Sequence, residues 1–290
     1  MRTFITAIVG ILLSSSMAHA QACPGYSVRL DQMQGDIYDP AGVLDTRVII
    51  QLSVDGGDAP AECAQLPAVI SSGSVAEPVA TAFRNPDSLQ DLTGNYPGNQ
   101  DASLAGLRLE LSLGARQRLV AGESVALNIV DLSAGQFRRA GIYTSLIQAQ
   151  IGEGAPVSFN LTSDVVPVMQ LLASSADGQE TITLGDPTNG ATGTTTFHFR
   201  SNTGVRVSAS SLNNGHLRHE GGTGHTIPYT MRIADTPVNL SPGPGALDLS
   251  FTNVMERASL IEVSILPRPA NDMPYAGIYR DTVTLSFTPF

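Results

Sequence analysis

Short runs in which apolar and polar residues alternate recur along most of the chain. Each run has a period of two and ends at Gly, Pro, Asn, Asp or Ser, which is the pattern of a strand with one buried face. Helical periodicity is poor, and the segment Pro78–Leu92 offers a short helix at most because Pro86 limits it. The pattern predicts an all-β protein made of β-sandwiches. The clearest runs are Val48, Ile50 and Leu52; Leu107, Leu109, Leu111 and Leu113; Val125, Leu127 and Ile129; Val283, Leu285 and Phe287.

A sequence repeat predicts two domains. Ala140-Gly141-Ile142-Tyr143 recurs as Ala276-Gly277-Ile278-Tyr279, and a gapless alignment of the two copies also superposes the strand from Val125 on the strand from Ile261. We therefore expect two homologous β-domains, residues 21–151 and residues 157–290. Residues 152–156, a Gly-rich stretch closed by a proline, are the expected linker.

The first twenty residues have the pattern of a secretory signal peptide. Arg2 is a short positive region, Phe4–Leu13 is an apolar core, and Ala18-His19-Ala20 is an A-x-A cleavage site. The apolar run is too short to span a membrane, and no later stretch is long enough. We expect export from the cytoplasm, a mature start near Gln21 and no membrane span.

Cys23 and Cys63 are the only cysteines. In an exported chain they are expected to pair, and closing a loop of this size stabilises a fold by about 4 kcal/mol in the chain-entropy model. Two free, buried thiols are the alternative.

Composition narrows the classes of partner. The chain has 290 residues, 42% hydrophobic and 14% charged, which argues against a disordered protein. It has no lysine, so all 16 basic residues are arginine, and 26 acidic residues give a net charge of −10. This acidity argues against nucleic acid and anionic membrane surfaces as partners.

The segment after the first AGIY copy reads as one more strand. Val157, Phe159 and Leu161 alternate with polar residues. This strand either opens the second domain or pairs back with the first and closes its sheet. Nothing comparable follows Phe290, which leaves the last strand of the second domain as an exposed apolar edge.

The second half resembles a known family. Ser211-Leu212-Asn213-Asn214-Gly215-His216-Leu217-Arg218-His219, followed by Thr226-Ile227-Pro228-Tyr229-Thr230, is similar to the central strands of spore coat protein U-like domains, the subunits of archaic chaperone–usher pili. Gly277, Tyr279 and Asp281 match the Gly-x-Tyr-x-Asp pattern of the family's terminal strand. The first half is a weaker match, with Tyr38-Asp39-Pro40 and Cys63 in family order but Thr144-Ser145 in place of the polar pair that contains Asp.

The resemblance implies two tandem immunoglobulin-like, pilin-like sandwiches, the second lacking its final strand. A periplasmic chaperone, and then a strand of the neighbouring pilin subunit delivered at an outer-membrane usher, would fill the resulting groove by strand addition. Val283, Leu285 and Phe287 would line the groove, and the chaperone would capture the carboxylate of Phe290. Such a protein reaches the cell surface in a pilus and serves attachment and biofilm formation.

The resemblance also suggests a position in the fibre. Cys23 follows the expected cleavage site so closely that the chain has no donor strand of its own, which predicts a two-domain tip adhesin that accepts a strand without giving one. Val157, Phe159 and Leu161 would then close the first domain in cis. In the long segment 71–105, Phe83 and Tyr96 are the expected adhesive residues; the alternative is that they anchor this segment to its own core. An internal pilus subunit is the second interpretation.

Other chemistry is weakly supported. His216, His219 and His225 with Glu220 are metal-ligand types, but His216 and His219 point to opposite faces of a strand. We expect no metal, no cofactor and no enzymatic activity, and we expect Tyr143 and Tyr279 to bond back across a sheet corner. A free-standing secreted β-sandwich that binds a metal or a small ligand is the alternative function.

Overall fold

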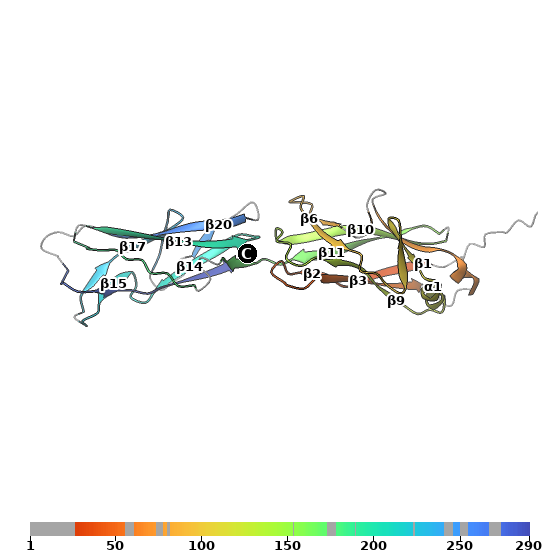
Figure 1. Cartoon of the computed structure of the whole chain (residues 1–290), viewed down its shortest axis with the longest axis horizontal. Helices are drawn as coiled ribbons and strands as arrows, with labels where there is room; N and C mark the ends of the chain where they lie inside the picture. Colours follow the sequence, from red (N-terminus) through yellow and green to blue (C-terminus); the bar gives the residue numbers. More distant parts are fainter. Residues whose placement is uncertain are drawn as a thin grey trace, which may run out of the picture.

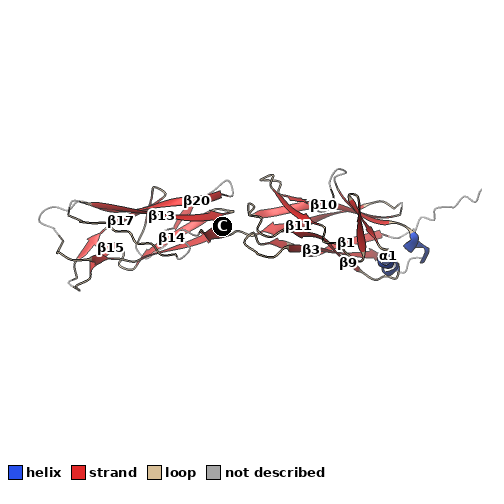
Figure 2. Cartoon of the chain, viewed as in Figure 1, coloured by secondary structure: helices blue, strands red, loops and turns tan. Residues whose placement is uncertain are grey.

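The computed structural model describes residues 27–55, 61–73, 78–79, 82–152, 154–172, 178–188, 190–222, 224–240, 246–249, 255–266 and 274–290. Strands dominate this part of the chain, and it contains one α-helix and a short 3-10 helix (Figure 2). The prediction of an all-β sandwich protein is confirmed. Figure 1 shows two sandwiches that lie end to end along the long axis, with the C-terminus between them.

Residues 27–165 form the first sandwich. One layer contains β1, β3 and β9, the other contains β4, β8, β10 and β11, and the short strands β5 and β6 connect the two layers at one corner. Its strands are β1 (Ser27–Gln34), β2 (Ile37–Tyr38), β3 (Thr46–Asp55), β4 (Ala68–Ser72), β5 (Ala82–Arg84), β6 (Asp91–Asn95), β7 (Ala102–Ala105), β8 (Arg108–Leu111), β9 (Val125–Leu132), β10 (Gly141–Ile151) and β11 (Val157–Val165); its helices are η1 (Ala61–Gln65) and α1 (Leu113–Val120).

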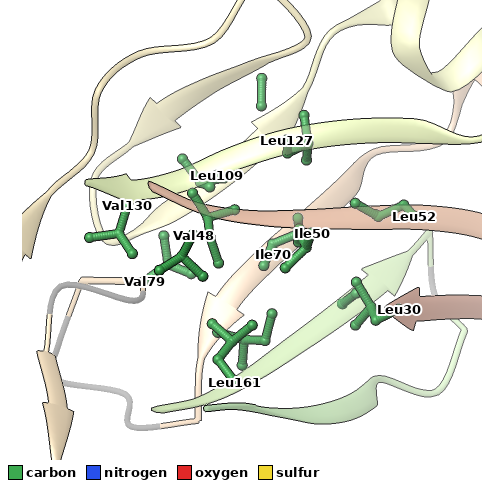
Figure 3. Packing of buried hydrophobic residues seen from close by; sticks show 14 of the residues in the cluster. Leu30, Val48, Ile50, Leu52, Ile70, Val79, Leu109, Leu127, Val130 and Leu161 are labelled. Carbon is green, nitrogen blue, oxygen red and sulfur yellow. The ribbon is translucent and has the colours of Figure 1, made fainter. Parts of the chain in front are cut away.

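The core of the first sandwich follows from strand alternation. Val48, Ile50 and Leu52 of β3 point inward and meet Ile70 of β4 and Leu161 of β11 from the opposite layer (Figure 3). All five side chains are buried. The period-two pattern of the sequence is therefore the pattern of the core.

Residues 169–290 form the second sandwich. Its sheets have the strand orders β12-β13-β20-β17-β18, β19-β14-β22 and β16-β15-β21. Phe199, Val205, Val207 and Ile233 are fully buried in its core. Its strands are β12 (Met169–Leu171), β13 (Ala191–Ser201), β14 (Val205–Ser211), β15 (His216–His219), β16 (Thr226–Pro228), β17 (Thr230–Ile233), β18 (Thr236–Val238), β19 (Ala246–Leu249), β20 (Met255–Ile265), β21 (Tyr279–Arg280) and β22 (Val283–Pro289).

The strand after the first AGIY copy belongs to the first sandwich. β11 pairs antiparallel with β10 from Ala149↔Val157 to Gly141↔Val165, so the two strands form a hairpin, and residues 152 and 154–156 lie in its connection. The chain crosses between the sandwiches at residues 166–168 instead of the expected linker 152–156, and the second unit starts after residue 165 instead of at 157. The physical reason is that the apolar face of β11 is buried in the first core.

The helix lies elsewhere than the sequence suggested. The described part of 78–92 contains β5 and the start of β6, whereas α1 begins one residue after Ser112, within the expected strand run that ends at Leu113. The Ser112 hydroxyl accepts a hydrogen bond from the Ala115 amide at 3.2 Å, which caps the helix. The inward residues of the helix, Ala115 and Leu119, are buried.

Candidate functional site

The two AGIY copies precede equivalent strands with different surroundings: the first copy begins β10, and the second leads through the short β21 into β22. The gapless alignment places Ile147, Ala149 and Ile151 of β10 on Val283, Leu285 and Phe287 of β22. β10 has a neighbour on each edge, because β4 pairs with one side and β11 with the other. Ile147 and Ala149 are accordingly buried.

β22 has a strand on one edge only. It pairs antiparallel with β14 over seven residues, from Val205↔Pro289 to Ser211↔Val283, and no described strand pairs with its other edge. Val283, Leu285 and Phe287 face the second core but stay half-exposed. We call the side of β22 that faces away from β14 the open edge. It combines unpaired backbone groups with a half-buried apolar row.

β11 closes the equivalent edge in the first sandwich with a row of apolar side chains. Leu161 and Val165 are fully buried, Phe159 is partly buried against the same core, and Val157 lies half-buried at the start of the strand. The structure therefore places Val157, Phe159 and Leu161 in the position of a closing strand within the first sandwich.

The outer edge of β11 is itself protected. The side-chain amide of Gln32 donates to the Thr162 carbonyl at 2.7 Å and accepts from the Thr162 amide at 2.8 Å. Further along, the Asp164 amide donates to the Asp36 carbonyl at 2.7 Å, and β2 pairs with the end of β11 in parallel. Gln32 thus occupies the place of a neighbouring strand, so the first sandwich is complete.

Phe290 is fixed at the end of β22. Its amide donates to the Gly204 carbonyl at 3.0 Å, and the Thr203 hydroxyl donates to the Phe290 carbonyl. The Arg206 guanidinium lies 5.4 Å from the centre of the Phe290 ring. Together these contacts hold the C-terminus between the two sandwiches, where Figure 1 marks it.

The repeated AGIY residues build a sheet corner in each sandwich. The Tyr143 hydroxyl donates to the Arg139 carbonyl at 3.0 Å, and the Tyr279 hydroxyl donates to the Tyr275 carbonyl at 3.0 Å, which confirms the predicted role of both tyrosines. Gly277 has a φ of 150°, and a Cβ there would lie 2.1 Å from Nε2 of His219. The glycine is therefore required by a close approach as well as by its backbone angle.

Asp281 organises the region where the open edge begins. Its carboxylate accepts hydrogen bonds from the Ser211 hydroxyl at 2.5 Å, from the Tyr229 hydroxyl at 2.6 Å and from the Asn213 amide at 3.1 Å. Burial, and then the hydrogen bond to Asp281, raise the pKa of Tyr229. This network connects β14, the residue after β16 and the start of β22.

The two expected adhesive residues do not protrude. Phe83 is fully buried in the first core, since the alternation of β5 turns it inward, and this contradicts its predicted role as an exposed contact residue. Tyr96 packs partly buried against the same core, and its hydroxyl donates to the Ala102 carbonyl at 2.9 Å. Both residues anchor the 71–105 segment to its own sandwich.

The predicted disulfide is described at one end. Cys63 is buried in η1, and the described residues contain no free cysteine. Cys23 lies outside the described residues, as do the signal peptide and the mature N-terminus, so the Cys23–Cys63 pair stays a prediction.

The histidines have contacts within the second sandwich. His219 lies between the Ala276 carbonyl, 3.2 Å from its Nε2, and the Gly221 amide, which donates to its Nδ1 at 3.0 Å. The His225 ring centre lies 3.9 Å from that of Tyr275. Among the described residues, no group of three or more His, Cys, Asp or Glu is placed to hold a metal ion, and no helix is long and apolar enough to cross a membrane.

No family model matches the chain, and no curated protein matches it in sequence. Several solved structures are similar to it at low scores. A chaperone–tip adhesin pre-assembly complex, CsuC–CsuE of the archaic Csu pili of Acinetobacter baumannii, matches with a TM-score of 0.42 and 15% identity over 90% of this chain and 100% of that chain. A chaperone–tip adhesin complex of CFA/I fimbriae biogenesis matches with a TM-score of 0.38 and 12% identity over 87% and 93%.

AggA, the major subunit of aggregative adherence fimbriae type I of Escherichia coli, matches with a TM-score of 0.36 and 11% identity over 51% of this chain and 98% of that chain. At these identities and scores the matches do not indicate a function.

Proposed function

We propose that this protein is an exported, non-enzymatic subunit of a chaperone–usher pilus and that its second sandwich accepts a strand from another polypeptide along the open edge. One observation carries the proposal: equivalent strands within one chain differ in that β10 is closed by β11, whereas β22 has no described partner on the corresponding side. A free edge beside a half-exposed apolar row favours pairing with another chain.

The direction of β22 constrains how the incoming strand enters. β22 runs towards the junction of the sandwiches, where the C-terminus lies (Figure 1). A strand that copies the relation of β11 to β10 is antiparallel to β22, so it leaves the site at the far end of the second sandwich. The body of the next subunit then extends the fibre away from the first sandwich. A parallel strand would leave at the junction, which the first sandwich occupies.

The proposal also covers the type of each domain, the chaperone contacts and the position of the subunit in the fibre. Residues 27–165 and 169–290 are two domains of the spore coat protein U-like type, the first adhesive and the second pilin-like. The periplasmic chaperone covers Val283, Leu285 and Phe287 and captures the carboxylate of Phe290 before the usher exchanges it for the next subunit. A complete sandwich ahead of an incomplete one suits the tip of the fibre at the cell surface, where it would serve attachment and biofilm formation.

Self-complementation tests the proposal. The sequence of β11, residues 157–165, is appended after Phe290 through a short glycine turn, because this strand already closes the equivalent position. The matched control carries the same tail with asparagine at the copies of Phe159, Leu161 and Val165. We expect the apolar tail to raise the melting temperature by about 5 °C or more over the control, because it buries the three apolar side chains of β22.

Hydrogen exchange supplies a second measurement. The apolar tail should slow amide exchange across residues 283–289, whereas the asparagine tail should leave it fast. Equal melting temperatures and equal exchange with both tails would contradict an open edge. That result would favour a free-standing secreted sandwich, which should be folded and monomeric without any added strand.

A further inference from the structure

A pocket of about 560 Å³ lies on the outer face of the first sandwich. Its floor is formed by outward residues of β4 and β10, with the tip of the β7–β8 hairpin on one side and Pro156 on another. The two ends of the long 71–105 segment meet here, since Ser71 and Ala105 both line the pocket. Its volume is within the range of small-molecule sites.

Three polar residues form a row across the floor. Gln148 of β10 is opposite Ser71 of β4, and Ser71 is opposite Arg108 of β8. Their chain neighbours Ile147, Ile70 and Leu109 are buried, so the row itself faces outward. With strands about 4.8 Å apart, the row spans about 10 Å from β10 to β8.

The two ends of the row differ in chemistry. At the β10 end, the Gln148 amide nitrogen donates to the Ser158 hydroxyl at 3.4 Å and the Gln150 amide nitrogen donates to the Gly154 carbonyl at 2.9 Å. These bonds leave the two side-chain oxygens as acceptors. At the β8 end, the Arg108 guanidinium has no ion pair or hydrogen bond within the part of the chain that the structure describes.

The described lining of the pocket differs in charge from the chain as a whole. The chain carries a net charge of −10, yet among the described residues that line the pocket there is no Asp or Glu, and the one charged residue is Arg108. Glu110 lies two residues further along β8, outside the lining. Val69, Leu107 and Pro156 add aliphatic surface.

The tip of the β7–β8 hairpin is fixed, because the buried Val79 donates its amide hydrogen to the Leu107 carbonyl at 3.1 Å.

We propose that this pocket binds an acidic saccharide of one or two rings. The Arg108 guanidinium binds the sugar carboxylate, the glutamine oxygens and the Ser71 hydroxyl bind ring hydroxyls, and the aliphatic residues contact the C–H faces of the ring. The site lies wholly within the first sandwich, so it stands whether or not β22 accepts a strand.

Calorimetry on the full mature chain tests the site with digalacturonic acid as the probe and lactose as an uncharged disaccharide. We expect digalacturonic acid to bind at least tenfold more tightly than lactose, because only the acid can form a charge-assisted hydrogen bond with the Arg108 guanidinium. Arg108→Gln should weaken the binding of digalacturonic acid about tenfold or more without changing the melting temperature. Gln148→Ala should weaken the binding of both sugars.

Arg218→Gln is the matched control, because Arg218 is an exposed arginine of the second sandwich. It should leave binding unchanged. The proposal is overturned if digalacturonic acid does not bind at millimolar concentration, if lactose binds equally well, or if Arg218→Gln weakens binding as much as Arg108→Gln does.

Discussion

Single side chains close the corner of each sandwich, and the two corners differ in burial. Tyr143 is fully buried, whereas Tyr279 is half-exposed, although each hydroxyl donates to the carbonyl four residues earlier at 3.0 Å. Removing a donor costs more where water cannot replace it. We expect Tyr143→Phe to lower the free energy of unfolding by about 1–2 kcal/mol and Tyr279→Phe to lower it by less, as measured by urea denaturation. Equal losses would contradict this account.

The response to high pH should come from tyrosine. Burial raises the pKa of Tyr38, Tyr143 and Tyr229 above the ordinary value near 10, and the chain has no lysine that could lose its charge in the same range. Above pH 10 the unfolded chain loses phenolic protons that the folded chain keeps. The unfolded state then binds fewer protons, so the free energy of unfolding falls as pH rises.

We expect this fall to begin near pH 10 and to reach about 1.4 kcal/mol per pH unit for each tyrosine that stays neutral in the folded state. Urea denaturation between pH 8 and pH 12 measures it. Tyr229→Phe should reduce the slope, and an unchanged slope would mean that Tyr229 ionises in the folded protein.

Gln32 contributes at the scale of an element, because its side chain bonds the outer edge of β11 at Thr162, ahead of the residues where β2 pairs with that edge. Its two hydrogen bonds to Thr162, at 2.7 and 2.8 Å, satisfy backbone groups that would otherwise be open. We expect Gln32→Ala to speed amide exchange in residues 157–165, as measured by mass spectrometry. Gln34→Ala, two residues further along β1, is the control and should leave this exchange unchanged.

β11 and β22 allow a matched test of packing. Leu161 of β11 is fully buried, whereas Leu285 of β22 is half-buried. Leu161→Ala should cost about 2–5 kcal/mol in the free energy of unfolding, and Leu285→Ala should cost clearly less in the chain alone. Attaching the β11-derived tail after Phe290 should increase the cost of Leu285→Ala, because the tail buries that side chain. A cost that the tail does not change would indicate that Leu285 is already fully packed.

Alternation identified the strands better than it identified their partners. The pattern Val157, Phe159, Leu161 predicted a strand with one buried face, but it fits either sandwich equally well, because period two carries no information about which sheet the strand joins. The pairing with β10 places Phe159 opposite Ile147 and buries Leu161 and Val165 in the first core, which only the folded chain shows.

Other differences have local causes. Phe83 is on a strand of three residues, too short for a visible alternation, so its inward direction could not be predicted. Ser112 is a residue type that favours the N-cap of a helix, but the alternating leucines up to Leu113 predicted a strand at this place. The pocket around Arg108 is lined by residues from three separate stretches of the chain, and no sequence motif connects them.

The contacts between the sandwiches determine whether the whole molecule behaves as one rod. Asn202 is buried, its side chain bonds the Val168 amide at 2.8 Å and the Val166 carbonyl at 2.9 Å, and its own carbonyl accepts from the Ala140 amide at 3.0 Å. The Arg200 guanidinium lies 4.6 Å from the centre of the Phe137 ring across the same junction. These contacts hold the crossing segment 166–168 against both sandwiches.

Asn202→Ala removes the two side-chain bonds to the crossing segment and keeps the backbone bond to Ala140. We expect the variant to sample a wider range of angles between the sandwiches. Small-angle X-ray scattering detects this as a broader distribution of interatomic distances with a lower peak. Asn213→Ala is the control, because Asn213 bonds the Arg280 carbonyl at 3.3 Å within the second sandwich alone. Its scattering should match that of the unmodified chain. If Asn202→Ala also matches, the rod is held by the backbone of residues 166–168 and by the contact between Phe137 and Arg200.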